Sequence, residues 1–171
     1  MDQILTQEEL DALKPAPRKP VILAIDPGTK CGWAILLPSG HMLSGFWNLK
    51  CKSDEGAGMR IIRLRRYLNE LRGAQRIDQV YYERVRRHLG ADAAHIYGGI
   101  TMELMAWCEE QTPKIPYGTI EVSAAKIAAI GKGNAGKEAM IKAARLRWPN
   151  DTLDDDNECD ARWIAIAAAN L

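Results

Sequence analysis

Three acidic residues from distant parts of the chain lie where metal-dependent chemistry could occur. Asp26 ends the apolar run 21–25, Glu83 ends the run 79–82, and Asp160 opens the apolar stretch 161–169. A carboxylate at the end of a buried element costs desolvation free energy unless a cation compensates for it. Hard divalent cations such as Mg²⁺ prefer oxygen ligands of this kind. The pattern therefore predicts that the three acids share a metal site.

The composition is typical of a single soluble globular domain. The chain has 171 residues, of which 26% are charged and 47% hydrophobic, enough for a substantial core. No apolar run approaches the length of a membrane span, and the acidic start is not a secretory signal. The four cysteines contain no Cys-x-x-Cys pair, which indicates reduced thiols and predicts a cytoplasmic protein.

The net charge of +1 conceals two oppositely charged segments. Residues 60–87 contain nine arginines against three acids, whereas residues 151–160 contain six acids and no basic residue. A basic surface beside an acidic pocket fits an enzyme that holds a polyanion and binds metal. A solvated helix face would give the same arginine pattern. Charge alone leaves both interpretations open.

Hydrophobic periodicity predicts a mixed α/β domain over residues 20–171. Strands are expected near 21–26, 31–37, 42–48, 77–82 and 117–121, and helices near 55–71, 91–110, 123–129, 136–147 and 156–169. In the first of these helices the apolar positions are Met59, Ile62, Leu64 and Leu68, with arginines on the other face.

Residues 1–19 are expected to form a separate N-terminal segment. Positions 3–13 have the pattern of a short amphipathic helix, with Thr6 and Glu9 at capping-box spacing and Leu10 and Leu13 on one face. The proline-rich stretch 14–20 then predicts an extended linker.

Four motifs in order resemble those of RuvC-type Holliday junction resolvases, especially the compact relatives carried by phages. They are ILAIDPGTKCGWAI at 22–35, QVYYE at 79–83, VSAAKIAAIGKGNAGK at 122–137, and the helix start at 157–165 that contains Asp160 and Ala161. Each motif is weak alone, but four in register make a more specific signal. The resemblance covers about residues 20–169. It implies a ribonuclease H-like fold, a mixed five-stranded sheet flanked by helices.

The resemblance also implies a catalytic site. Asp26, Glu83 and Asp160 match the family's metal-binding acids, and Asn157 lies where the family usually has Asp or His. Lys126 and Lys137 match its phosphate-neutralising lysines. Two Mg²⁺ ions, replaceable by Mn²⁺, are expected in such a two-metal phosphodiesterase site.

Two departures from the family pattern concern the ligands and the DNA contacts. Asn157 brings no charge, so Asp156 or Asp154 could complete the metal site instead. The aromatic wedge expected shortly after Glu83 is missing: this segment reads RVRRHL at 84–89, and Phe46 is the only phenylalanine. DNA contacts are expected from the cations near the site, namely Arg84, Arg86, Arg87, Lys126, Lys132 and Lys137.

The implied function is metal-dependent cleavage of four-way junctions or other branched DNA, in recombination and repair. The resemblance also implies a homodimer. The apolar stripe of 91–110 (Ile96, Ile100, Leu104 and Trp107) could form its interface or could belong to the core of the monomer.

Alternatives to this function are a ribonuclease H-like nuclease acting on hybrids or flaps, and a catalytically weak junction-binding protein, which Asn157 would suit. A third, an actin-like ATPase, shares the Asp-x-Gly-Thr hairpin but requires more residues and further motifs.

Overall fold

The computed structural model describes residues 6, 18–86 and 90–171. The helix expected over 3–13, except for Thr6, and most of the linker lie outside the described residues, as do Arg87, His88 and Leu89. All four cysteines are free. Within the described ranges, no helix has the length and apolar character needed to cross a membrane.

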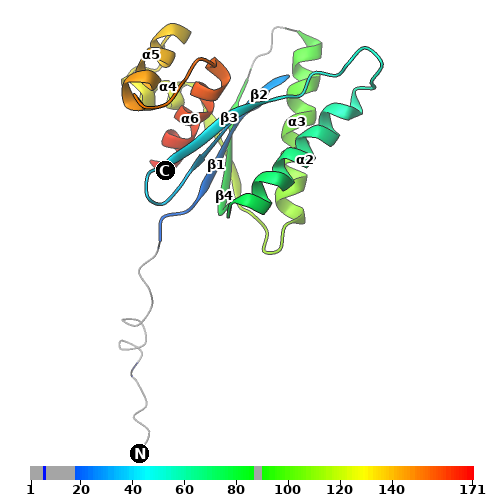
Figure 1. Ribbon diagram of the computed structural model, residues 1–171, viewed down its shortest axis with the longest axis horizontal. Helices are drawn as coiled ribbons and strands as arrows, with labels where there is room; N and C mark the ends of the chain where they lie inside the picture. Colours follow the sequence, from blue (N-terminus) through cyan, green and yellow to red (C-terminus); the bar gives the residue numbers. More distant parts are fainter. Residues whose placement is uncertain (1–5, 7–17, 87–89) are drawn as a thin grey trace, which may run out of the picture.

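The centre of the fold is a mixed five-stranded sheet (Figure 1). Its strands are β1 (Ile22–Asp26), β2 (Lys30–Leu36), β3 (Met42–Asn48), β4 (Gln79–Arg84) and β5 (Tyr117–Glu121). The spatial order is β3-β2-β1-β4-β5. The first three strands form an antiparallel meander, and β4 and β5 then add in parallel beside β1. Parallel pairing needs long crossovers, which the helices between these strands supply.

Helices cover both faces of the sheet (Figure 1). They are α2 (Gly58–Ala74), α3 (Ala91–Glu110), α4 (Val122–Ile130), α5 (Lys137–Arg147) and α6 (Asp156–Ala169). Helices α2 and α3 pack on one face, and α6 lies on the other with α4 and α5 beside it. The expected α/β class and the five-stranded arrangement are confirmed.

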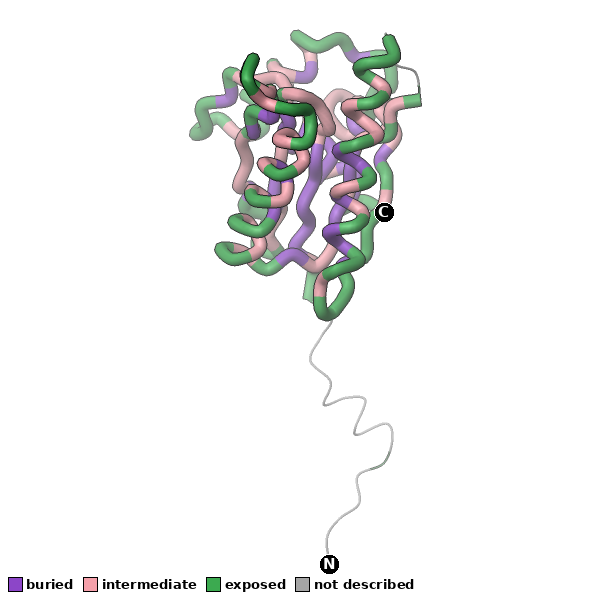
Figure 2. The backbone as a smooth tube through the Cα atoms, turned by 90° about the vertical axis from the view of Figure 1, so that its right-hand side faces the viewer, coloured by how far each residue is buried: buried purple, intermediate pink, exposed green. Residues whose placement is uncertain are grey.

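Side-chain alternation along the strands divides the interior into two cores. Leu23 and Ile25 of β1 face α2 and α3, whereas Ile22 and Ala24 face α6. Asp26 follows Ile22 and Ala24 in this alternation, so its side chain is directed to the face covered by α6. In Figure 2 the buried backbone runs along the central strands, and the exposed backbone lies on the outer helices and loops.

Helix α2 begins later and faces differently than its sequence suggested. It starts at Gly58 rather than near Glu55, because the Glu55 side chain accepts a hydrogen bond from the Lys52 amide and pairs with Arg63 instead. The buried positions are Leu64 and Leu68, whereas Ile62 is 61% exposed. Residues 62 and 64 lie about 200° apart on a helix, so both cannot face the core. The inward assignment of Ile62 was therefore wrong.

Candidate active site

Asp26 and Glu83 end up together because their strands are parallel neighbours. Ile25 pairs with Tyr82 in the register of β1 and β4, so Asp26 and Glu83 are the next residues along the two strands. Parallel strands carry their carboxyl ends to the same edge of the sheet, and paired positions point to the same face. Both carboxylates are thus directed to the side that α6 covers.

Helix α6 brings two further carboxylates to this edge. Asp156 and Asp160 are four residues apart, about one helical turn, and therefore share a face. The first turn lies directly on β2 at Gly32, where an added Cβ would stand 2.0 Å from the carbonyl oxygen of Asn157. Only glycine permits this approach, so Gly32 sets how closely the acids of α6 reach the strand ends.

The electrostatics of the site are those of uncompensated negative charge. The pKa of Asp26 is well above its usual value because the carboxyl is buried and because Glu83, Asp160 and Asp156 lie nearby. Burial, and then the charge of Asp160, raises the pKa of Glu83 to about 7. Burial, and then Asp156, raises the pKa of Asp160 to about 6. Burial is the first cause of all three raised pKa values, and the neighbouring acids add to it.

Two lysines oppose this repulsion. Lys126 of α4 lowers the pKa values of Glu83 and Asp160, and Lys137 at the start of α5 forms an ion pair with Asp156. Both lysines line a cavity of 260 Å³ together with Glu83 and Asp160. The cavity lining thus combines two carboxylates with two ammonium groups, and one of these ammonium groups already pairs with Asp156.

The structure distinguishes the candidates for the fourth acidic position. The side-chain amide of Asn157 donates hydrogen bonds to Asp155 (3.2 Å) and Asp156 (3.3 Å). Asp156 raises the pKa values of both Asp26 and Asp160, so it contributes its charge to the site. Asp154 is exposed and pairs with Arg145 at 3.0 Å. The arrangement favours Asp156 over Asn157 and leaves Asp154 with a separate partner.

The donor set suits a hard cation, although it is not closed around one. Among the described residues, no group of three or more Asp, Glu, His or Cys side chains stands at metal-ligand spacing. The carboxylates are nevertheless close enough to raise one another's pKa values, and they supply only oxygen donors. Such a set fits Mg²⁺ or Mn²⁺, since a divalent cation would remove the repulsion.

The arginines near the site are partly neutralised by an acid from the neighbouring strand. Glu121 at the end of β5 pairs with Arg84 (3.4 Å) and Arg86 (2.8 Å). Farther along the basic segment, Arg63, Arg65, Arg66 and Arg76 also form ion pairs with acids. Six of the eight arginines described within residues 60–86 therefore have an acidic partner, so part of the positive charge of this segment is neutralised locally. Lys132 is exposed on the loop between α4 and α5.

The chain's only phenylalanine lies on the edge strand beside the site. Phe46 pairs in register with Gly32, which pairs in turn with Asp26, so the three residues form one row across β3, β2 and β1. The ring is 45% exposed, and the Lys30 ammonium lies 4.1 Å from its centroid. With strands about 4.8 Å apart, Phe46 lies about 10 Å from Asp26. This row could not be found before the strand register was known.

Tyr97 of α3 is a supporting residue that sequence reasoning missed. Its hydroxyl donates to the Glu83 carbonyl (3.0 Å) and accepts from the Val85 amide (3.3 Å), so it holds the backbone on both sides of Arg84. Nothing in the sequence links these positions, because the tyrosine follows Glu83 by fourteen residues on another element.

A buried network fixing α6 to β3 was also missed. Arg162, one of few buried charged residues in the described part of the chain, donates to Ser44 (2.7 Å) and Asp151 (2.6 Å). Ser44 donates in turn to Glu158. At the helix start, Asp155 accepts the amides of Asn157 and Glu158 and pairs with Lys30. Asp155 lies three residues before Glu158, and an aspartate at this distance from a glutamate is an N-cap signal that was present in the sequence.

A five-stranded mixed sheet with acids at the ends of β1 and β4 and on the last helix defines a ribonuclease H-like fold. No family model matches the chain. It is 28% identical over 151 residues to the crossover junction endodeoxyribonuclease RuvC of Ruegeria pomeroyi, covering 86% of this chain and 90% of that protein.

Solved structures show the same likeness. Thermus thermophilus RuvC in complex with a Holliday junction substrate superposes with a TM-score of 0.75 and 22% identity, covering 88% of this chain and 93% of the other. The yeast mitochondrial Holliday junction resolvase Ydc2 gives 0.63 and 14%, covering 91% and 80%. The chain is therefore similar in sequence to a RuvC endonuclease and has the fold of the RuvC-type resolvase structures.

Proposed function

We propose that this protein is a structure-selective endodeoxyribonuclease that cuts Holliday junctions and related branched DNA during recombination and repair. The observation that carries the proposal is the convergence of Asp26, Glu83 and Asp160 from three elements, on a fold that superposes on a resolvase bound to its junction. Free cysteines fit a reducing, cytoplasmic setting for this activity.

Asp26, Glu83, Asp160 and Asp156 are the residues that would hold the cations, as two Mg²⁺ ions or Mn²⁺ in their place. Bound there, the cations would lower the pKa of a coordinated water and neutralise charge on the scissile phosphate. The burial of the carboxylates keeps bulk water from screening this charge. Asn157 has a different part: it holds Asp155 and Asp156 in place through its amide.

The lysines of the cavity would meet the phosphate. Lys126 and Lys137 line it together with Glu83 and Asp160, so a phosphate that enters it places its oxygens near ammonium groups. Lys137 is 68% exposed and pairs with Asp156, so it can exchange this partner for a phosphate oxygen. Asp156 is then free for a cation.

Contacts to the DNA backbone would come from both ends of the carboxylate edge. Arg84 and Arg86 lie on one side and can exchange Glu121 for phosphate. Lys132 is exposed on the loop that follows α4. On the other side, Phe46 and Lys30 offer an aromatic face and a cation to an unstacked nucleotide. Phe46 thereby takes over part of the role of the missing wedge, and Arg87 remains a predicted contact.

A homodimer fits the substrate, because a four-way junction presents two equivalent strands related by a two-fold axis. Of the two alternatives for the apolar stripe of α3, the structure supports the core: Ile100, Leu104 and Trp107 are buried in the monomer. Exposed apolar side chains on the same helical layer are Ile62 of α2 (61% exposed) and Met102 of α3 (64% exposed). We propose that the dimer uses this outer surface.

The proposal is tested with a synthetic four-way junction, a linear duplex and an RNA–DNA hybrid, each with and without Mg²⁺. We expect nicks in opposing strands of the junction only, and only with the cation. Cleavage of the hybrid alone would instead indicate the ribonuclease H-like alternative. Binding without cleavage in either metal would indicate a junction-binding protein, an interpretation weakened by the carboxylate of Asp156 at the site.

A further inference from the structure

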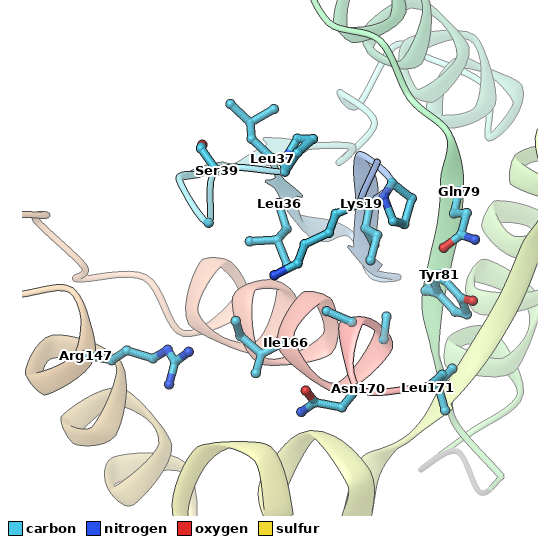
Figure 3. A pocket seen from close by; sticks show the side chains of 16 residues that line it. Lys19, Leu36, Leu37, Ser39, Gln79, Tyr81, Arg147, Ile166, Asn170 and Leu171 are labelled. Carbon is cyan, nitrogen blue, oxygen red and sulfur yellow. The ribbon is translucent and has the colours of Figure 1, made fainter. Parts of the chain in front are cut away.

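A cavity of 590 Å³ lies at the opposite end of the sheet from the carboxylates. Figure 3 shows it between the sheet and the last turns of α6, with Leu36 and Tyr81 on the sheet side and Ile166 on the helix. Ile22, which begins β1, also lines it, whereas Asp26 ends that strand. The cavity is thus about 15 Å from the candidate active site.

The cavity lies where the start of β1, the end of β2 and the last turn of α6 come together. Its lining combines aliphatic and aromatic side chains with cations, as expected for a surface that receives an amphipathic segment. Lys19 and Arg147 belong to this lining and make no ion pair with another described residue. In Figure 3 the Lys19 side chain extends past Leu36 toward α6, and Arg147 lies to one side.

The chain's own N-terminal segment has the complementary chemistry. Residues 1–13 contain four acids (Asp2, Glu8, Glu9 and Asp11) and no basic residue. Their pattern predicts an amphipathic helix over 3–13 with Leu10 and Leu13 on one face. An acidic helix with an apolar stripe matches a cavity whose lining combines apolar side chains with Lys19 and Arg147.

The segment is also attached at the right place. Lys19 and Pro20, where the chain joins the domain, are themselves part of the cavity lining. The connection from Leu13 to Lys19 can span about 19 Å in an extended proline-rich conformation, and an eleven-residue helix is about 16 Å long. The helix can therefore fold back over the cavity. A tether this short gives an effective concentration in the millimolar range, which favours this segment over one from another copy.

We propose that this cavity is the docking site of residues 3–13 of the same chain. Leu10 and Leu13 enter the hollow between Leu36, Tyr81 and Ile166, and the acids of the segment meet Lys19 and Arg147. Docking covers the exposed end of the sheet. It also keeps four carboxylates away from the cations that surround the candidate active site.

The test compares backbone amide NMR spectra and amide exchange of the full chain with two variants. In Leu10→Gln/Leu13→Gln the apolar face is lost, and we expect shifted signals and faster exchange at residues 36–40, 79–81 and 166–170. The matched control Ala12→Gln changes another face of the segment and should leave these signals unchanged. Arg147→Glu should shift the signals of residues 3–13 in the same direction as the leucine variant.

Three results would overturn the proposal. Identical spectra for the wild type and the leucine variant would mean that the cavity is not covered by this segment. Changes confined to the surroundings of Asp26 and Lys126 would place the segment elsewhere. Changes that disappear on dilution, together with a doubled mass at high concentration, would assign the docked segment to a second copy. None of these results depends on nuclease activity, so the docking site and the proposed function are tested separately.

Discussion

Two sets of carboxylates in this protein differ in what surrounds them. Asp155 and Glu121 have nearby cations or amides, and their pKa values are lowered by these partners. Asp26, Glu83 and Asp160 lie in buried positions beside one another, and their pKa values are raised. Asp155 caps α6 and thereby stabilises the fold, whereas the exposed pairs of Glu121 contribute little. The second set destabilises the fold, which is expected where a protein keeps charge ready for a ligand or a reaction.

The largest effect should follow from removing one acid of the buried set. We expect Asp26→Asn to slow junction cleavage by about 1,000-fold or more, because several kcal/mol of charge stabilisation at the phosphate is lost. Single-turnover cleavage of a labelled junction measures this, with gel-shift binding in parallel. Asp154→Asn, which alters an exposed paired acid, is the control and should cleave at the wild-type rate. Unimpaired cleavage by Asp26→Asn would contradict the site.

Breaking the buried network at Arg162 should cost stability rather than chemistry. Arg162→Leu leaves Ser44 and Glu158 without their cationic partner, and we expect a loss of about 3 kcal/mol in the free energy of unfolding. Urea denaturation followed by tryptophan fluorescence gives this value. The exposed pair of Arg66 and Glu70 supplies the comparison, since Arg66→Leu should change stability by about 0.5 kcal/mol or less. Equal losses of unfolding free energy in both variants would mean that the buried Arg162 network stabilises the protein no more than the exposed pair does.

Variants of Asp156 and Asn157 test which of the two side chains is a metal ligand. We expect Asp156→Asn to reduce cleavage by about 100-fold at low Mg²⁺, with partial recovery at high Mg²⁺ or in Mn²⁺, because a charged ligand is lost. Asn157→Ala should change the rate only a few-fold, and Asn157→Asp should leave the metal requirement nearly unchanged. Titrations of cleavage against each metal measure these differences. A lower Mg²⁺ requirement in Asn157→Asp would return position 157 to the ligand set.

Removing charge from the buried set should stabilise the metal-free protein. The pKa of Glu83 is about 7 in the folded state against an ordinary value of 4.5, so the folded protein binds more protons than the unfolded chain between these pH values. Stability therefore falls as the pH rises through this window, and the loss is complete above about pH 7. We expect Glu83→Gln to be more stable than wild type by about 1 to 3 kcal/mol at pH 8.

Urea denaturation in EDTA at pH 5 and pH 8 checks this prediction. The difference between the variants should be small at pH 5, where Glu83 is already protonated in the folded wild type. Adding Mg²⁺ at pH 8 should stabilise the wild type more than Glu83→Gln. A variant less stable than wild type at pH 8 in EDTA would show that the carboxylate is compensated after all.

The smallest effect concerns Glu121 and the two arginines that it pairs with, Arg84 and Arg86. Glu121→Gln frees Arg84 and Arg86 from an acid, so we expect junction binding to tighten about tenfold at low salt with a steeper salt dependence. Arg84→Ala/Arg86→Ala should weaken binding and reduce the slope of log K against log salt by about 2. Fluorescence anisotropy from 50 to 300 mM salt measures both. If both variants bind as the wild type does, these arginines do not touch DNA.

Much of the fold followed from local patterns. The strands over 22–26 and 42–48 and the helix over 91–110 lie almost where the hydrophobic periods placed them. The start of α2 differed, because Glu55 pairs with Arg63 and Lys52 instead of entering the helix. Ile62 was misassigned because arginines interrupt the apolar stripe of this helix, so its period could not be read reliably.

The sequence by itself placed Asp26 and Glu83 at or near the ends of strands and Asp160 beside an apolar helical run, and this identified the three acids as candidates. A carboxylate next to an apolar run can be recognised in the sequence, and the run itself predicts that this position is buried. Only the tertiary structure decided which acids of 151–160 face the site, since their partners Lys30, Ser44 and Arg145 come from other elements. Electrostatic free energy depends on distances in space, and these distances are set when parallel strands and α6 assemble around Gly32.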